Sequence, residues 1–241
     1  NHLELKKYKG VFKSYKEIYK HYAQLSRMKM DGKVVMHYYN YNLLQPYIKS
    51  NENQIFLDIG GGNGLLASII TQTYKPKTFF MIDLPSTLMN AFCYLYNCDL
   101  KINITLPHSI TSNIDIEKII NRKKDNYTNF IFLTPSQANL INSNTVDLSI
   151  NTTSFQEMTS EQINFYFNLI ERISKNNSLF YCVNRIEKIP QEIMNNESCR
   201  PNLFYEYPWK QGNERLINET SRLSTACQYE SVAIRLERVK K

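Results

Sequence analysis

The chain has 241 residues, a hydrophobic content of 42% and a formal net charge of +7. This length suits one α/β domain with a substantial core, and no apolar run approaches the roughly 20 residues that a membrane span requires. The five cysteines are scattered and form no CxxC pair, which argues for reduced thiols and against a zinc site. Because the start NHLELKKYKG also lacks a signal-peptide pattern, we expect a cytoplasmic location.

Residues 1–50 are predicted to form an N-terminal helical cap. Apolar side chains recur there at helical spacing, at Val11, Tyr15, Ile18, Tyr22 and Leu25. Basic residues dominate between positions 6 and 33, which is typical of a solvated helical face. The same charge would suit a surface that attracts a negatively charged small molecule or a nucleic acid, and charge alone does not decide between these interpretations.

Residues 51–241 are predicted to form one domain in which strands and helices alternate. The expected strands are QIFLDI, TFFMID, LKINITL, NFIFLTP, TVDLSI and SLFYCV. The expected helices are GLLASIITQTY, PSTLMNAFCYLYN, DIEKIINRKK and TSEQINFYFNLIERI, the last with Thr159 and Gln162 spaced as a capping box. This alternation predicts a Rossmann-like, mostly parallel sheet with helices on both faces. ERLINETSRL and SVAIRLERV predict an antiparallel hairpin at the C-terminal edge.

A glycine-rich turn follows the first expected strand and opens the first expected helix. Four of the chain's seven glycines lie within it, at Gly60, Gly61, Gly62 and Gly64. Ligands of open α/β sheets bind beyond the carboxyl ends of the strands, and such a concentration of glycine predicts that a ligand approaches the backbone. The stretch GNGLLA, residues 62–67, formally matches the dinucleotide fingerprint GxGxxA.

Two carboxylates help to choose the ligand. Asp58 lies at the end of the first strand, where a carboxylate would repel a pyrophosphate but suits a ligand that carries an amino group and a sulfonium. S-adenosylmethionine (SAM) is such a ligand. Asp83 ends the second strand, where it can accept hydrogen bonds from both hydroxyls of a ribose. Asp83 therefore predicts a nucleoside without separating SAM from NAD.

The run DIGGGNG, residues 58–64, resembles motif I of class I SAM-dependent methyltransferases, and IDLP after the second strand is similar to small-molecule O-methyltransferases. Three later runs resemble the bacterial sugar O-methyltransferase family: VDLSINTTSFQEM, FYCVNRIEKIP and FYEYPWKQGNERLI. The resemblance extends from about residue 50 to the C-terminus. It implies SAM as the cofactor, bound by Asp58, Gly60, Gly61, Gly62, Asn63, Gly64, Asp83, Leu84, Asn151 and Ser154.

Methyl transfer to a sugar hydroxyl requires alignment and a means of removing the hydroxyl proton, by a general base or a metal. The end of the fourth strand of such a fold lies near the methyl group, and Glu157 is the ionisable side chain found there. Glu157 is therefore our first candidate base, His108 the second and His37 the third. Glu157 at a helix start is also explained by its favourable interaction with the helix dipole. No cluster of His, Asp and Glu shows metal-ligand spacing.

The sequence thus predicts a SAM-dependent O-methyltransferase that acts on a sugar or a related small polyhydroxylated molecule, including a negatively charged one. Three alternatives remain open: an RNA methyltransferase, favoured only by the charge, an NAD-dependent oxidoreductase, and a SAM-binding protein without catalysis. The segment between Asp83 and NFIFLTP is longer than class I methyltransferases usually need. Residues 99–125 are therefore a candidate insertion, and the sequence leaves open whether LKINITL or NFIFLTP is the third strand of the fold.

Overall fold

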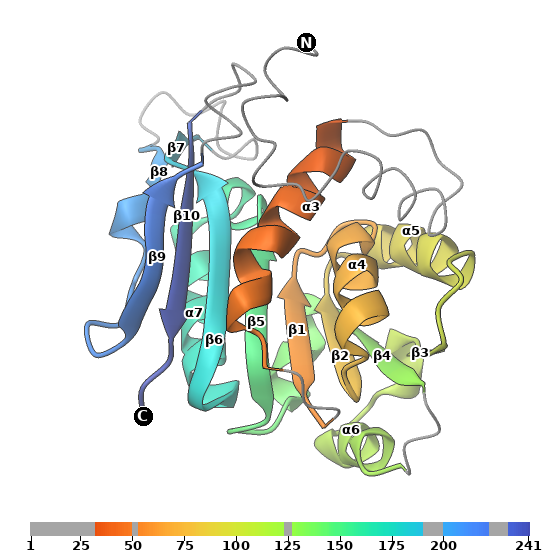
Figure 1. The fold of residues 1–241 in the computed structure, drawn as a ribbon. Helices are drawn as coiled ribbons and strands as arrows, with labels where there is room; N and C mark the ends of the chain where they lie inside the picture. The colour runs from red at the N-terminus through yellow and green to blue at the C-terminus, as the bar shows by residue number, and fades with distance from the viewer. Residues whose placement is uncertain (1–31, 50–52, 123–126, 190–199, 222–230) are drawn as a thin grey trace.

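An eight-stranded sheet forms the centre of the computed structural model, which describes residues 32–49, 53–122, 127–189, 200–221 and 231–241 (Figure 1). Its strands are β1 (Ile55–Ile59), β2 (Thr78–Ile82), β3 (Ile102–Thr105), β4 (Thr128–Leu133), β5 (Val146–Thr152), β6 (Ser174–Arg185), β9 (Glu214–Thr220) and β10 (Val232–Arg238). The strand order is β3-β4-β2-β1-β5-β6-β10-β9, and every pair from β3 to β6 is parallel. A separate two-stranded ribbon pairs β7 (Glu187–Lys188) with β8 (Asn202–Leu203).

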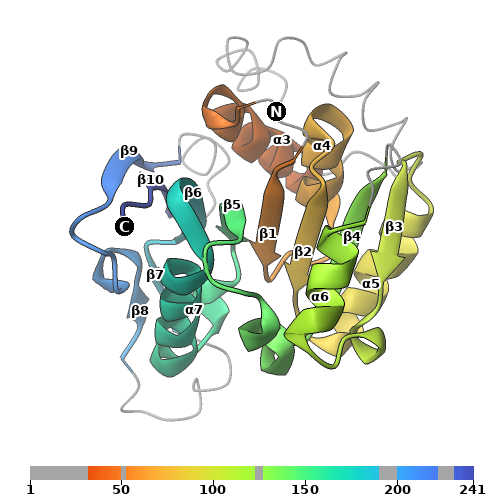
Figure 2. The same ribbon diagram turned by 90° about the horizontal axis from the view of Figure 1, so that it is seen from below.

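Helices cover both faces of this sheet, as the alternating sequence pattern predicts. They are α3 (Gly32–Leu44), α4 (Leu65–Tyr74), α5 (Pro85–Tyr96), α6 (Asn113–Ile120) and α7 (Ser160–Ile173). One hydrophobic core joins α3, α4 and α5 to one face of the sheet, and a second joins α6 and α7 to the other. Figure 2 shows α3 and α4 on the side of the sheet opposite to α6 and α7.

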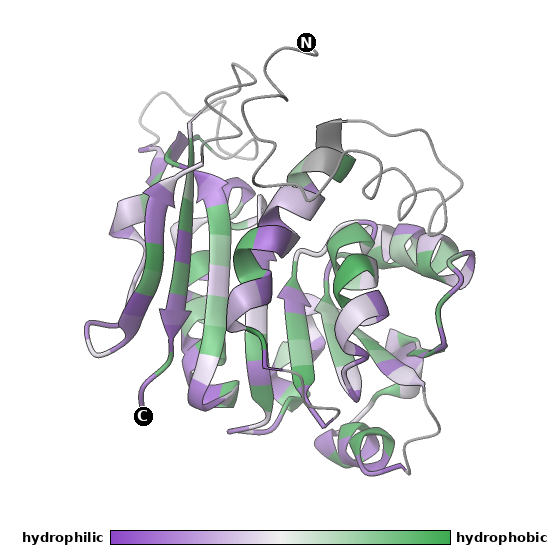
Figure 3. Ribbon diagram, viewed as in Figure 1, coloured by the Kyte–Doolittle hydropathy of each residue, from purple (hydrophilic) through white to green (hydrophobic). Residues whose placement is uncertain are grey.

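The central strands are buried on both faces because their side chains are apolar throughout. Phe56 and Phe79 point into the first core, while their neighbours Leu57 and Phe80 point into the second. The hydropathy colouring of Figure 3 shows the same feature, with hydrophobic residues concentrated in the central strands. Each such strand therefore removes apolar surface from water on two sides, which is the main source of stabilisation in this architecture.

The candidate insertion contains one strand and one helix, β3 and α6. β3 lies outside β4, so β4 and not β3 is the neighbour of β2. Without β3, the order of the parallel strands corresponds to the 3-2-1-4-5 order of doubly wound sheets. Residues 99–125, as far as they are described, thus add β3 at the outer edge and α6 on one face.

The predicted helical cap is described only from Gly32 onward. α3 packs against α4 and the sheet, and the Tyr181 hydroxyl donates to Asn40 Oδ1 at 3.1 Å. Its tyrosines Tyr38, Tyr39 and Tyr41 are buried, so they serve packing. The basic segment and the apolar periodicity predicted for residues 1–31 lie outside the described residues.

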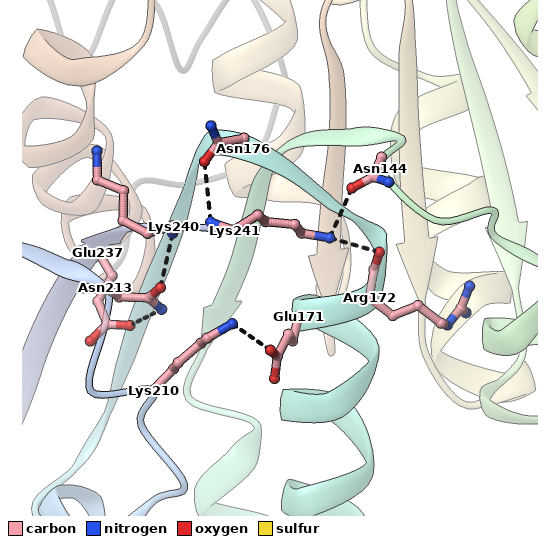
Figure 4. Close-up of polar contacts among 9 residues, drawn as sticks. All are labelled: Asn144, Glu171, Arg172, Asn176, Lys210, Asn213, Glu237, Lys240 and Lys241. Atoms are coloured by element: carbon pink, nitrogen blue, oxygen red, sulfur yellow. Dashed lines mark hydrogen bonds and ion pairs between the residues drawn. The ribbon is translucent and has the colours of Figure 1, made fainter.

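The C-terminal strands form the predicted antiparallel edge, in which β10 pairs with both β6 and β9. Polar contacts fasten the chain after β10 to the amino end of β6 and the end of α7 (Figure 4). Lys241 donates through its backbone N–H to Asn176 Oδ1 at 3.2 Å and through Nζ to Asn144 Oδ1 at 2.9 Å. These contacts lie at the amino ends of the parallel strands, whereas the glycine turn lies at their carboxyl ends. Among the described helices, none is long and apolar enough to cross a membrane.

Candidate functional site

The glycine turn lies at the carboxyl end of β1, between β1 and α4. Gly60, Gly62 and Gly64 have φ angles of +68°, +59° and +80°, a left-handed conformation that only glycine adopts without strain. The Gly60 N–H donates to the carbonyl of Ile82 at 2.8 Å, which joins the turn to the end of β2. The clustered glycines are therefore required by the backbone path itself.

The surroundings of the turn differ between its two sides. A Cβ atom added to Gly60 would lie 2.1 Å from Ser154 Oγ, so the turn is packed tightly against the loop after β5. A Cβ added to Gly61 would lie 2.9 Å from the carboxylate of Asp58. At Gly62, by contrast, no atom of the described chain lies within 4 Å of such a Cβ. Gly62 therefore presents bare backbone to open space, as a turn that receives a ligand requires.

Asp83 lies beside this open side of the turn. Its carboxylate accepts hydrogen bonds from the backbone N–H groups of Gly62 at 3.0 Å and Leu84 at 2.7 Å. Burial raises the pKa of Asp83, and the hydrogen bonds from Leu84, Gly62 and Thr87 oppose that increase. The side chain is half-buried. A carboxylate held rigidly at the end of β2, next to an open glycine turn, has the position needed to bind the hydroxyls of a ribose.

Asp58 is buried, whereas its position at the end of the first strand suggests a carboxylate that faces the ligand. It is 1% exposed, and neither carboxylate oxygen has a hydrogen-bond partner among the described residues. Burial, and secondarily the negative charge of Asp83, raises its pKa to about 8. At neutral pH the group is therefore mainly protonated in the ligand-free protein. A cation above the turn would stabilise its ionised form.

Asn151 and Ser154 hold the turn from behind. Asn151 Nδ2 and Ser154 Oγ both donate to the carbonyl of Ile59, at 2.9 and 3.1 Å. Asn184, at the end of β6, donates to Asn151 Oδ1 at 2.8 Å, and its own Oδ1 accepts from the Gln156 N–H at 3.1 Å. The ends of β1, β5 and β6 are thus joined by one buried network of amides. Such a satisfied network rigidifies the site.

Glu157 lies in the short 3₁₀ helix Phe155–Glu157 that follows β5. Its Oε1 is 2.9 Å from Lys188 Nζ and accepts from Gln156 Nε2 at 3.1 Å. Burial acts to raise the pKa of Glu157, but the bonds from Lys188 and Gln156 and the charges of Lys188 and Arg185 outweigh it and lower the pKa. Glu157 is placed near the turn, because its N–H donates to the carbonyl of Ser154 at 3.0 Å. Its ion pair makes it a weak base in the ligand-free protein.

The two candidate histidines belong to other parts of the fold: His108 follows the outer strand β3, and His37 lies on helix α3. His108 is exposed in the 3₁₀ helix Pro107–Ser109 after β3. Three strand spacings of about 4.8 Å separate β3 from β1, so His108 follows a strand ~14 Å from the strand that carries the turn. His37 is half-buried on α3. Glu157 is joined to the turn through Ser154, whose hydroxyl donates to the carbonyl of Ile59.

Sequence reasoning missed Asn184 and Lys188 as parts of this site. They belong to the run NRIEK, which the structure brings into contact with Gln156 and Glu157 of the run SFQEM. Trp209 of the run FYEYPWKQGNERLI packs against Phe167 and Phe204, and the Arg235 guanidinium lies 4.2 Å from the centre of its ring. In the described part of the chain, no group of three or more His, Cys, Asp and Glu side chains is placed to hold a metal ion.

The comparisons with known proteins place the fold. No protein-family model matches the chain, and no curated protein matches it. Solved structures do match. A candidate sarcosine dimethylglycine methyltransferase from Galdieria sulphuraria is 10% identical, with a TM-score of 0.56 over 86% of each chain. The geranyl diphosphate C-methyltransferase of Streptomyces coelicolor A3(2) is 11% identical, with a TM-score of 0.50 over 83% of this chain and 76% of that one.

The YcgJ protein of Bacillus subtilis is 10% identical, with a TM-score of 0.51 over 85% of this chain and all of its own. The chain therefore has the Rossmann-like fold found in SAM-dependent methyltransferases, as predicted. These neighbours include enzymes described for different acceptors and none described for a sugar, so the sugar acceptor remains a prediction from the sequence.

Proposed function

We propose that this protein is a SAM-dependent O-methyltransferase whose acceptor is a sugar or a related small polyhydroxylated molecule. The observation that carries the cofactor assignment is the glycine turn, open at Gly62 and bordered by Asp83. The Streptomyces neighbour was crystallised with S-adenosyl-L-homocysteine, which supports the same class of cofactor. The acceptor class rests on the resemblance of the SFQEM, NRIEK and YPW runs to sugar O-methyltransferases.

The residues present fit SAM better than a dinucleotide. A dinucleotide would bring the negative charge of a pyrophosphate to the turn, and this charge would disfavour the ionised form of the buried Asp58. SAM instead carries a sulfonium and an ammonium group. When bound, it supplies a methyl group that is already activated for displacement. Gly62 and Asn63 would lie along the cofactor, Asp83 would hold its ribose, and the buried charge of Asp58 would favour its positive groups.

The remaining chemistry belongs to the acceptor. The chain must align the acceptor oxygen with the methyl carbon and must take the proton of the hydroxyl. Glu157 is the first candidate base because it is joined through Ser154 to the carbonyl that precedes the turn. His108 and His37 remain the second and third candidates.

A ligand comparison tests the proposal. A ligand that binds only the folded state raises the temperature of unfolding by mass action. SAM and S-adenosylhomocysteine should raise it, while NAD and NADP should not. Stabilisation by NAD but not by SAM would establish the oxidoreductase alternative. Incubation with methyl-labelled SAM and a panel of neutral and phosphorylated sugars would then identify the acceptor, and transfer only to RNA would contradict the acceptor class.

A further inference from the structure

The charges around the candidate site are separated into two groups. Asp83, together with Asp58 once a cation has favoured its ionised form, lies next to the glycine turn, where the proposed cofactor carries positive charge. Beyond the ends of β5 and β6, the cations Lys188 and Arg185 both act on a single carboxylate, Glu157. Glu157 thus has two cations acting on it, and a negatively charged acceptor group would compete with it for them.

Lys188 is held at this position by the small ribbon of β7 and β8. Glu187 pairs with Leu203 and Lys188 pairs with Asn202, and the ribbon lies against the 3₁₀ helix that contains Glu157. The side chain of Lys188 is 18% exposed and that of Glu157 is 41% exposed. The pair is thus partly shielded from solvent but open on the carboxylate side.

This ion pair conflicts with the role proposed for Glu157. A carboxylate that is neutralised by an ammonium group at 2.9 Å is a poorer proton acceptor than a free one. The charged and titratable groups that face Glu157 are Lys188 of β7, Arg185 of β6 and Tyr207, while the Gln156 amide also donates to it. A change in one of these partners would restore its basicity, and Lys188 is the cation in direct contact with the carboxylate, at 2.9 Å.

We propose that Lys188 recognises a negatively charged group of the acceptor and, by turning toward that group, releases Glu157 to act as the base. The inference rests on the proposed function. The acceptor hydroxyl then gives its proton to Glu157, and its oxygen forms a bond to the methyl carbon as the bond from carbon to sulfur breaks. The sulfonium becomes the neutral thioether of S-adenosylhomocysteine, so charge and atoms balance. A neutral sugar leaves the ion pair closed and is methylated slowly.

The titration of Glu157 tests this arrangement directly. Carboxyl-labelled glutamate reports it by NMR, with the signal of Glu157 assigned by its loss in Glu157→Gln. Inorganic phosphate should raise the pH midpoint of Glu157 in the wild-type protein more than chloride does at equal ionic strength, because chloride only screens the pair. Lys188→Met should raise the midpoint without phosphate and should abolish the response to phosphate.

A matched variant controls for the loss of any ion-paired lysine. Lys175 is 2.9 Å from Asp147 at the opposite edge of the sheet, so Lys175→Met should change neither the Glu157 midpoint nor the response to phosphate. A Glu157 midpoint that phosphate moves no more than chloride does, or that phosphate moves equally in Lys188→Met, overturns the proposal.

Calorimetry with SAM distinguishes failure of the methyltransferase assignment from failure of the role proposed for Lys188. A wild-type protein that binds no SAM refutes the methyltransferase assignment, while the NMR result still decides the role of Lys188.

Discussion

Two glycines of the turn share one backbone conformation but differ in their surroundings, and this difference allows a sharp test. An alanine at Gly60 (φ +68°) or at Gly62 (φ +59°) would adopt a left-handed conformation at a cost of about 1–2 kcal/mol. At Gly60 the new methyl group would also overlap Ser154 Oγ at 2.1 Å and Ser154 Cβ at 2.3 Å. Such overpacking costs typically about 1–3 kcal/mol. We expect Gly60→Ala to lose about 2–5 kcal/mol of stability. Gly62→Ala should lose only the cost of the left-handed conformation, about 1–2 kcal/mol.

The overlap can be removed from the other side. Ser154→Gly deletes both clashing atoms and leaves Ser154 Cα at 3.8 Å from the added methyl group, an ordinary contact. By itself Ser154→Gly should cost about 1 kcal/mol, because its hydroxyl donates to the carbonyl of Ile59 at 3.1 Å. In the double variant the two changes should couple favourably by about 1–3 kcal/mol, so that the pair is more stable than the sum of the single changes.

Urea unfolding of the wild type, the single variants and the double variant measures the stability, and calorimetric titration measures SAM affinity. Gly60→Ala should act mainly through the fold. Gly62→Val should bind SAM far more weakly than its loss of stability explains, because no atom of the described residues lies within 4 Å of the added Cβ while a ligand on the turn would meet it. Equal stabilities of Gly60→Ala and Gly62→Ala, or no coupling to Ser154→Gly, would refute the packing argument. Unchanged SAM affinity in Gly62→Val would remove the cofactor assignment.

Three further outcomes are expected. Asp83→Ala should weaken SAM binding by about 1–3 kcal/mol, measured by calorimetry, because charge-assisted hydrogen bonds to the ribose are lost; a normal affinity would contradict this. Glu157→Gln should keep SAM affinity but lower turnover by roughly 10²–10⁴-fold, whereas a normal rate in Glu157→Gln with a loss in His108→Ala or His37→Ala would identify a histidine as the base. Added salt should slow methylation of a negatively charged acceptor and leave SAM affinity unchanged. A methylation rate that does not depend on salt would show that surface charge does not attract the acceptor.

The layers of the fold could be predicted from the sequence, but the order of the strands could not. Apolar runs such as QIFLDI and NFIFLTP identify strands buried on both faces, and β1 and β4 are fully buried. Glycine and Pro85 mark the helix starts, and the capping box of Thr159 and Gln162 is confirmed at α7. The position of β3 outside β4 depends on which apolar surfaces remain to be covered. That is a property of the whole sheet and leaves no local signal.

In the candidate site, too, some features could be predicted from the sequence and others could not. The glycine turn and the carboxylates at the ends of β1 and β2 follow from local pattern, because the ends of adjacent parallel strands meet at one edge. The contacts of Asn184 with Gln156 and of Lys188 with Glu157 join runs that lie far apart in the sequence. Both runs were visible as motifs, but only the pairing of β5 with β6 places them side by side. The burial of Asp58 likewise depends on the tertiary packing around it.

That burial makes the protein's stability and its SAM affinity depend on pH. The pKa of Asp58 is raised from 3.8 to about 8 in the folded state, so the folded state holds the proton more tightly than the unfolded chain does. The stabilisation is complete below the unfolded pKa and is lost as pH rises toward 8. Each pKa unit is worth about 1.4 kcal/mol, which makes the effect several kcal/mol at most. Asp58→Asn should flatten this dependence.

A bound SAM cation should reverse the preference, because it favours the ionised carboxylate. Binding near neutral pH should therefore release a proton, and SAM affinity should increase as pH rises toward 8. Calorimetry in two buffers of different ionisation enthalpy counts the released protons. We expect up to about one proton for the wild type and none for Asp58→Asn. A binding enthalpy that is the same in both buffers for the wild type would show that Asp58 does not respond to the cofactor.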